Sequence, residues 1–238
     1  MAESLRHLAD PLWRVLPGPS AYPSVVAAME AHVDRMTRGD AGEEIWLVEH
    51  DPVVTAGTSA SMADLLQPSR FPVVPAGRGG QFTYHGPGQR VIYPMLDLSR
   101  RGRDVRRYVA ALEGWAIAAL DLLGIAAGTS QVGTGIWVRD SGQPGRLLKI
   151  GAIGVRVRRW ISFHGLALNV TTELGHFDAI VPCGISEHGV TRLADLRPGL
   201  DMRALDQALL NSLPTLLHSL SSDTMPCIKT LEGVGDCS

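Results

Sequence analysis

The chain has 238 residues, of which 45% are hydrophobic and 19% are charged, and its formal net charge is -2. This length allows one large domain or two small ones with a sizeable core. The near-neutral charge argues against whole-molecule attraction to nucleic acid or to an anionic membrane. No apolar run approaches the roughly 18 residues that span a bilayer, and the first residues lack a signal-peptide core. We therefore expect a cytoplasmic protein without nucleic-acid or membrane partners.

The first hundred residues are predicted to contain one helix and two strands. Residues 22–38 carry apolar side chains at helical spacing, and an apolar stretch of strand character follows at 43–50. Residues 58–74 are interrupted by prolines, which predicts a loop with at most a turn of helix. A second strand is expected over 90–98. It follows the glycine-rich stretch "GRGGQFTYHGPG", which is poor material for a helix or a plain strand.

The next part of the chain predicts a long helix and then three strands. The helix starts after the N-cap residue Asp104 and stops at Gly124, with apolar side chains along one face. The three strands are expected over 135–140, 146–159 and 160–170. Because short turns separate them, they indicate an antiparallel part of a sheet.

The C-terminal part predicts one more amphipathic helix over 201–220, which contains Pro214. The tail over 221–238 lacks periodicity, so we expect it to be loosely attached. No repeat, low-complexity tract or linker divides residues 1–220. We predict a single α+β domain over 1–220, with a mixed β-sheet flanked by helices.

Cys183 is the most conspicuous candidate for a nucleophile. The other two cysteines, Cys227 and Cys237, lie in the tail, and the three together lack metal-ligand spacing and make a disulfide framework unexpected. Cys183 stands between Pro182 and Gly184, where a turn could expose its thiol to a substrate. A buried structural thiol is an equally good interpretation from composition alone, since free cysteine is often buried.

Lys149 is the second candidate, because it interrupts the apolar stretch "RLLKIGAIGV". A lysine at a solvent-facing position of a strand is the ordinary explanation. The functional alternative is that Lys149 points into a site. There its ammonium group would favour the thiolate form of a neighbouring cysteine, and such a pair suits acyl transfer.

Two histidines, His85 and His164, are candidate metal ligands together with Cys183, and His50 is an ordinary strand-end residue by its position. His85 and His164 are each followed by glycine. Their separations from one another and from Cys183 match no zinc spacing, so no metal is expected. The stretch "GRGGQ" leads into a strand and not into a helix, which disfavours a nucleotide-binding loop.

Five motifs together resemble one family, the lipoyl(octanoyl) transferases. They are, in order, "RGGQFTYHGPGQ", "YPMLDL", "KIGAIGVRV", "SFHGLALNV" and "VPCGI", with "EHDPVVTAGTSA" upstream. The resemblance implies a catalytic domain like that of biotin protein ligase and lipoate ligase. It implies transfer of an octanoyl group from octanoyl-acyl carrier protein to a lysine in protein lipoylation, with no cofactor. The implied acceptors are the lipoyl domains of 2-oxoacid dehydrogenases and the glycine cleavage H protein.

The resemblance also assigns roles to residues. Cys183 is implied to carry the acyl group and Lys149 to assist it, with His164 as possible support. The implied substrate-binding residues are Arg78, Gly79, Gly80, Gln81, Phe82, Thr83, Tyr84, His85, Ala152, Ile153, Gly154, Gly165, Leu166 and Ala167. The glycines among them would let backbone line a narrow acyl tunnel. Gly151 stands where the family commonly has alanine, a difference that bears on the shape of the tunnel.

Two other functions fit parts of the pattern. An ATP-dependent lipoate or biotin ligase could share the fold, although adenylation needs no cysteine. A binding module for acyl proteins is the alternative outside enzymes. Because carrier proteins are acidic, two basic clusters are candidate docking surfaces or simply solvated faces. They are Arg100, Arg101, Arg103, Arg106 and Arg107, and Arg156, Arg158 and Arg159.

Overall fold

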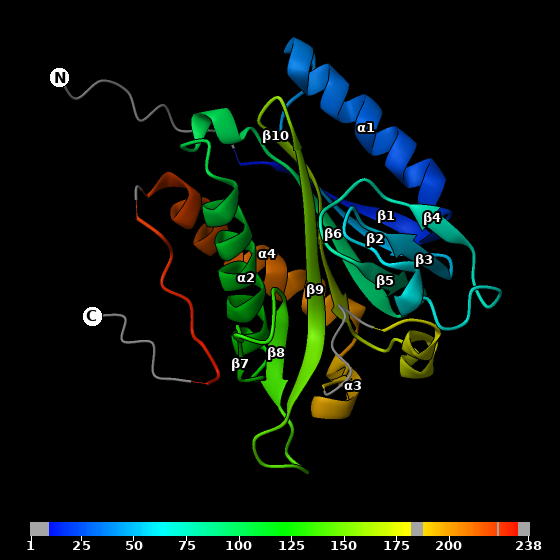
Figure 1. The fold of residues 1–238 in the computed structure, drawn as a ribbon. Coiled ribbons are helices and arrows are strands. Elements are labelled where there is room, and N and C mark those ends of the chain that lie inside the picture. Colours follow the sequence, from blue (N-terminus) through cyan, green and yellow to red (C-terminus); the bar gives the residue numbers. More distant parts are fainter. Residues whose placement is uncertain (1–9, 182–187, 223, 233–238) are drawn as a thin grey trace.

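The computed structural model describes residues 10–181, 188–222 and 224–232 (Figure 1). Its main feature is a large mixed sheet with a smaller sheet beside it. The large sheet runs in the order β1 (Leu12–Ser20), β2 (Glu44–His50), β6 (Gln89–Met95), β10 (Ile161–Asn169), β9 (Leu147–Arg158), β8 (Ile136–Arg139) and β7 (Ala127–Gly128). The short strand β11 (Gly189–Val190) pairs with β9, and the small sheet runs in the order β4 (Val73–Pro75), β3 (Val53–Ala56) and β5 (Phe82–His85).

Helices cover both faces of the large sheet. The helices are α1 (Tyr22–Arg38), α2 (Val105–Leu122), α3 (Leu193–Leu196) and α4 (Met202–Ser221), and the 3-10 turns are η1 (Met62–Asp64), η2 (Leu98–Arg100) and η3 (Leu174–Ala179). Figure 1 shows α2 and α4 on one side of β9 and β10 and α1 on the other. None of the helices in the described part of the chain is long and apolar enough to cross a lipid bilayer.

The core between α2, α4 and the sheet holds the largest group of buried apolar side chains. Trp115 of α2 is fully buried, and its indole Nε1 donates to the carbonyl oxygen of Leu209 in α4 at 2.9 Å. The Asp104 side chain caps α2 by accepting from the backbone N–H of Arg107, as its position before the apolar stretch predicts. Truncating such a buried tryptophan to alanine costs about 3–5 kcal/mol.

Helix α1 packs on the opposite face through Val25, Met29 and Val33, which follow helical spacing. These side chains meet apolar residues of β2, β6 and β10. The helix ends at Gly39, whose φ of 82° lies in the left-handed region that glycine adopts readily. Packing by α1 holds β6 and β10 in place, and both strands contribute to the cavity described below.

The single α+β domain with flanking helices is confirmed, and so is the antiparallel arrangement of β8, β9 and β10. The sequence pattern missed β1, which contains Pro17, Gly18 and Pro19. Those residues are unusual inside a strand, and here they fall at an edge, where the pairing with β2 shifts register after Val15. The strand β5 inside the glycine-rich stretch was also missed, because its four residues are too few to show a period.

The segment after α4 contacts the domain where the structure describes it. Thr230 forms a bridge with Thr129, Leu231 is buried against Trp137, and the Glu232 carboxylate accepts from the Gln131 N–H. A boundary near residue 220, with a separate tail to 238, stays a prediction. Cys227 is disulfide-bonded in the structure, although the cysteine pattern had predicted no disulfide framework.

Candidate active site

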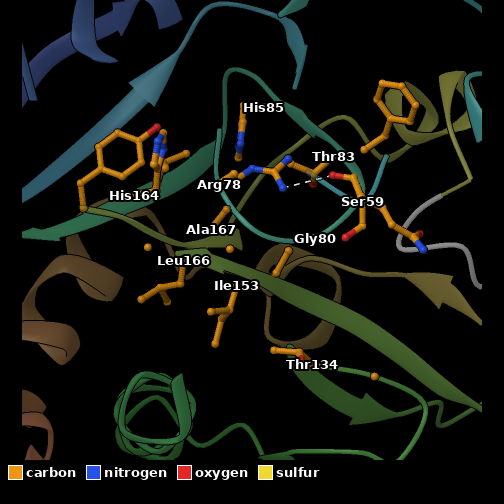
Figure 2. A pocket seen from close by; sticks show the side chains of 18 of the residues that line it. Ser59, Arg78, Gly80, Thr83, His85, Thr134, Ile153, His164, Leu166 and Ala167 are labelled. Atoms are coloured by element: carbon orange, nitrogen blue, oxygen red, sulfur yellow. Dashed lines mark hydrogen bonds between the residues drawn. The ribbon is translucent and has the colours of Figure 1, made fainter. Parts of the chain in front are cut away.

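A cavity of about 350 Å³ lies between β5 of the small sheet and the central strands β6, β9 and β10 of the large one (Figure 2). Its walls are mixed in character. Leu166, Ala167 and Ile153 give it an apolar wall, while Arg78 and His85 add polar groups. A cavity with an apolar wall and a few polar groups is suited to an alkyl chain that carries a polar function.

Most of the substrate-binding residues implied by resemblance lie around this cavity. The lining includes Arg78, Gly80, Gln81, Phe82, Thr83, His85, Ala152, Ile153, Gly154, Gly165, Leu166 and Ala167, together with His164. Gly79 and Tyr84 do not line it. The Gly79 N–H donates to the carbonyl oxygen of Val155, and the Tyr84 hydroxyl bonds to His176 Nδ1 at 2.7 Å. The binding roles of the lining residues remain predictions.

Several lining residues were not anticipated. They are Tyr22, Ser59, Val91, Tyr93, Val132, Gly133 and Thr134. They come from α1, from β6 and from two loops, far apart in the sequence. Ser59 and Tyr93 belong to the quoted motifs "EHDPVVTAGTSA" and "YPMLDL", which could have indicated them. The other five look like ordinary core or loop residues, and only the folded chain brings them to the cavity.

Arg78 organises the glycine-rich loop from a buried position. Its guanidinium donates from Nη2 to the Thr55 carbonyl and hydroxyl oxygens at 3.0 and 2.7 Å. From Nη1 it donates to the carbonyl oxygens of Gly79 and Gln81 at 3.0 and 3.1 Å. The side chain therefore joins β3 to the loop before β5. Charge-assisted bonds of this kind hold a loop in one conformation.

Close backbone approach explains one glycine of the predicted tunnel. Gly154 pairs with Gly165 across β9 and β10. A Cβ atom on Gly154 would lie 2.9 Å from both the Arg78 Cδ atom and the Gly79 carbonyl oxygen. The loop that carries Arg78 can approach β9 this closely because Gly154 has no side chain.

Lys149 is buried beside the cavity and does not occupy the solvent-facing position that its strand would have allowed. The residue is 6% exposed. Its Nζ atom donates to the carbonyl oxygen of Thr134 at 2.9 Å and lies 5.0 Å from the centre of the Trp137 ring. Thr134 lines the cavity, so Lys149 stands at that end of it. A smaller adjoining cavity is lined by Lys149, Ala152 and Ala167.

Glu113 of α2 lies near Lys149 and was not predicted. Its carboxylate accepts from the Gly135 N–H at 3.2 Å. Burial raises the pKa of this carboxyl, while the Gly135 bond and the Lys149 ammonium act in the opposite direction. The loop over 133–135 is thus hydrogen-bonded to two charged side chains, those of Lys149 and Glu113.

Imidazole and phenol rings form the other end of the cavity. Burial lowers the pKa of His50, His85 and His164, in the last case to about 3, with Arg78 contributing to the lowering at His85 and His164. These rings are therefore neutral near pH 7. His50 Nδ1 must donate to the Ser20 carbonyl oxygen, so its Nε2 accepts from the Tyr93 hydroxyl at 2.8 Å.

The predicted nucleophile Cys183 lies outside the described residues. The described chain resumes at His188, whose Nδ1 lies 3.3 Å from the carbonyl oxygen of Leu147. Two residues later Val190 pairs with Lys149 in a parallel register. Within the described ranges, no group of three or more His, Cys, Asp or Glu side chains is placed to hold a metal ion.

The structure corrects part of the expected basic surface. Arg101 is buried in an ion pair with Glu43, and Arg107 is buried with its guanidinium donating to the carbonyl oxygens of Ser222 and Arg101. These two arginines hold the start of α2 against its neighbours and do not face a partner. Arg103 and Arg106 of the same cluster are exposed.

The fold and the cavity place the chain in a known class of catalytic domains. Residues 21–214 match a model of the lipoyl protein ligase A/B catalytic domain. The match spans most of the chain, including α1, the residues that line the cavity and every strand except the edge strand β1. The chain therefore belongs to this family of lipoyl protein ligase A/B catalytic domains.

Several curated relatives that match this chain are named octanoyltransferases. One from Cereibacter sphaeroides is 55% identical over 212 residues, which are 86% of this chain and 97% of the relative. One from Sphingopyxis alaskensis is 55% identical and covers 90% of this chain and 97% of the relative. The chain is accordingly a transferase enzyme of the octanoyltransferase type.

Solved structures of distant relatives confirm the predicted fold. A bipartite lipoate protein ligase from Thermoplasma acidophilum superposes with a TM-score of 0.68 at 16% identity, covering 88% of this chain and 84% of that one. A lipoate-protein ligase A bound with ATP gives a TM-score of 0.66 at 16% identity, covering 88% of this chain and 86% of that one. At this identity the likeness concerns the fold alone.

Proposed function

We propose that the protein transfers an octanoyl group from octanoyl-acyl carrier protein to a lysine of a lipoyl domain, through a thioester on Cys183. The observation that carries this proposal is the position of Lys149. A buried ammonium group at one end of a largely apolar cavity, in a relative of octanoyltransferases, suits the binding and activation of an acyl thioester. The chain that contains Cys183 leads into β11, which pairs beside Lys149.

In the first step the Cys183 thiolate attacks the carbonyl carbon of the carrier-protein thioester. The Lys149 ammonium favours the thiolate over the thiol. Collapse of the tetrahedral intermediate breaks the bond to the carrier-protein sulfur, which leaves as a thiolate and takes up a proton from the Lys149 ammonium. The octanoyl group is then bound to Cys183, with its alkyl chain along the cavity wall that includes Leu166 and Ile153.

In the second step the neutral amine of the acceptor lysine attacks the enzyme thioester. The carbon–sulfur bond breaks, an amide forms, and the proton released by the amine returns to the Cys183 sulfur. Exchange of one thioester for another is close to neutral in free energy, and amide formation is downhill. The reaction therefore needs neither ATP nor a cofactor.

The acceptors in this proposal are the lipoyl domains of 2-oxoacid dehydrogenases and the glycine cleavage H protein. One fold relative is described as part of a lipoylation system together with its E2 lipoyl domain. That system uses a ligase, whereas the curated relatives of this chain are named octanoyltransferases. We propose that the enzyme acts in the cytoplasm.

The mass of the intact protein tests the proposal after brief incubation with octanoyl-acyl carrier protein. Wild type is expected to gain one octanoyl group that hydroxylamine removes, and Cys183→Ala is expected to gain none. Lys149→Ala should acquire the adduct much more slowly. Acylation of a lipoyl domain without any adduct on wild type would exclude Cys183 as the acyl carrier. Transfer of free octanoate only when ATP is present would point to a ligase instead.

A further inference from the structure

The end of the cavity away from Lys149 contains buried tyrosine and histidine side chains. The Tyr22 hydroxyl and His164 Nε2 are buried and have no hydrogen-bond partner among the described residues. Tyr22 is 2% exposed and His164 is 1% exposed, and both line the cavity. A buried polar group without a partner costs about 1–3 kcal/mol. Two of them at one end of the cavity therefore indicate that this end receives a hydrogen-bonding group.

The two ends of the cavity lie at different points along β9. Lys149 Nζ bonds to Thr134 at one end, whereas His164 pairs with Val155, six residues further along the strand. Figure 2 shows Thr134 and His164 on opposite sides of the pocket, with Ile153 between them. An acyl chain bound by its carbonyl end near Lys149 would therefore direct its other end towards His164.

The backbone at His164 holds the ring in this place. Its φ of 56° is in the left-handed region, which is uncommon for a residue other than glycine, and it lies within strand β10. Such a conformation costs about 1–3 kcal/mol and is retained mainly at functional sites. The His164 ring stacks on Phe163 with 5.3 Å between centroids and meets the Tyr93 ring edge at 6.1 Å.

The chemistry of this end favours a neutral group. Tyr22 stacks on His85 with ring centroids 6.0 Å apart, and burial raises the pKa of its hydroxyl to about 12, so it remains a donor. His85 Nδ1 donates to the Gln89 side-chain oxygen at 2.6 Å, which leaves Nε2 with its lone pair. Arg78, the nearby cation, already donates to four protein oxygens.

We propose that this end of the cavity, formed by Tyr22, His85 and His164, is a subsite for a hydroxyl group at the far end of the acyl chain. A hydroxyl both donates and accepts, so it can pair with the Tyr22 hydroxyl and an imidazole nitrogen together. The proposal rests on the proposed acyl transfer and adds a substrate class to it: acyl chains hydroxylated at the terminal carbon.

The test compares transfer of octanoyl and 8-hydroxyoctanoyl groups from the same carrier protein, and of decanoyl and 10-hydroxydecanoyl groups. Wild type should use at least one hydroxyl-bearing chain as well as its unsubstituted partner or better. Tyr22→Phe should lower kcat/KM for that chain about tenfold relative to its partner, the loss expected for one hydrogen bond. His164→Asn should also lower the ratio of kcat/KM for the hydroxyl-bearing chain to kcat/KM for its partner. Asparagine is chosen because it tolerates the left-handed backbone.

Tyr108→Phe is the matched control. Its hydroxyl is also buried but donates to the Pro94 carbonyl oxygen in the core, away from the cavity. This variant should leave the ratio unchanged. A ratio that also stays unchanged in Tyr22→Phe and His164→Asn would overturn the subsite. The subsite would also be overturned if wild type transferred octanoyl but rejected both hydroxyl-bearing chains. Failure of wild type to transfer octanoyl would instead contradict the proposed function.

Binding of the free acids gives a readout that does not depend on turnover. Melting temperatures are compared with 8-hydroxyoctanoic and octanoic acid at equal concentrations. The hydroxy acid should stabilise wild type more than octanoic acid does, and Tyr22→Phe should remove the difference. Equal stabilisation of wild type and Tyr22→Phe by the hydroxy acid would count against the subsite.

Discussion

Lys149 and Thr134 are joined by a 2.9 Å hydrogen bond from the lysine Nζ to the threonine carbonyl oxygen. This bond fixes a buried cation at one wall of the cavity, because Thr134 itself lines that cavity. The Trp137 ring lies under the same ammonium group. A charge held this way is in position to act on a reacting group without reorganising.

Replacing Lys149 by methionine should reduce acyl transfer at least a hundredfold. Methionine keeps much of the side-chain volume but removes the charge and the protons, and groups of this kind contribute about 10²–10⁴-fold. The rate of octanoyl transfer to a lipoyl domain measures the effect. Lys229→Met, at an exposed position, is the control and should stay near wild type. If the activity of Lys149→Met stayed within threefold of that of wild type, Lys149 would have no part in the chemistry.

Arg78→Lys should destabilise the protein, because an ammonium cannot reproduce the four bonds of the guanidinium to Thr55, Gly79 and Gln81. Leaving buried carbonyl oxygens without donors should lower the free energy of unfolding by about 2–4 kcal/mol. Urea unfolding followed by circular dichroism measures it. Arg203→Lys on the exposed side of α4 should change stability by less than about 0.5 kcal/mol. Equal effects of the two changes would show that Arg78 does not organise its loop.

Gly154→Ala should impair binding of the acyl substrate. The added Cβ would lie 2.9 Å from the Gly79 carbonyl oxygen and from Arg78 Cδ, so the cavity wall must move. We expect KM for octanoyl-acyl carrier protein to rise at least fivefold. Gly114→Ala in α2 is the contrasting change. A Cβ atom at Gly114 would lie 3.9 Å from the Ile228 side chain, which is an ordinary van der Waals distance. Alanine there should raise the free energy of unfolding by up to about 1 kcal/mol and leave KM unchanged.

Stability should fall as the pH falls from about 6.5 towards 3. The pKa of His164 is lowered to about 3 in the folded protein by burial and by Arg78, while the unfolded chain has a pKa near 6.5. Between these values the unfolded state binds the proton and the folded state does not, so acid favours unfolding. One such histidine changes the free energy of unfolding by up to about 1.4 kcal/mol per pH unit.

Urea titrations at pH 7.5, 6.0, 5.0 and 4.5 check this dependence. His164→Asn should flatten the slope of stability against pH, since asparagine does not titrate. His218→Asn, at an exposed position late in α4, should keep the wild-type slope. A His164→Asn profile parallel to that of wild type would contradict the assignment of acid sensitivity to this ring.

The sequence by itself was enough for the main helices, for the antiparallel strands β8 to β10 and for the family. Long elements can be predicted from local periodicity, as in α2, where the N-cap residue Asp104 precedes the apolar stretch. The motifs around Arg78, Ile153 and Leu166 likewise pointed to segments that meet at one cavity. Short or edge elements such as β1 and β5 carried no readable period.

The tertiary structure alone decided where side chains point and what surrounds them. The alternation of its strand allowed Lys149 to face solvent. In the folded protein the side chain is buried against Thr134 and Trp137. Two arginines of an apparent basic surface are buried: Arg101 pairs with Glu43, and Arg107 donates to the Arg101 carbonyl oxygen. Tyr22 reached the far end of the cavity from α1, because contacts between distant segments form only when the sheets and helices pack.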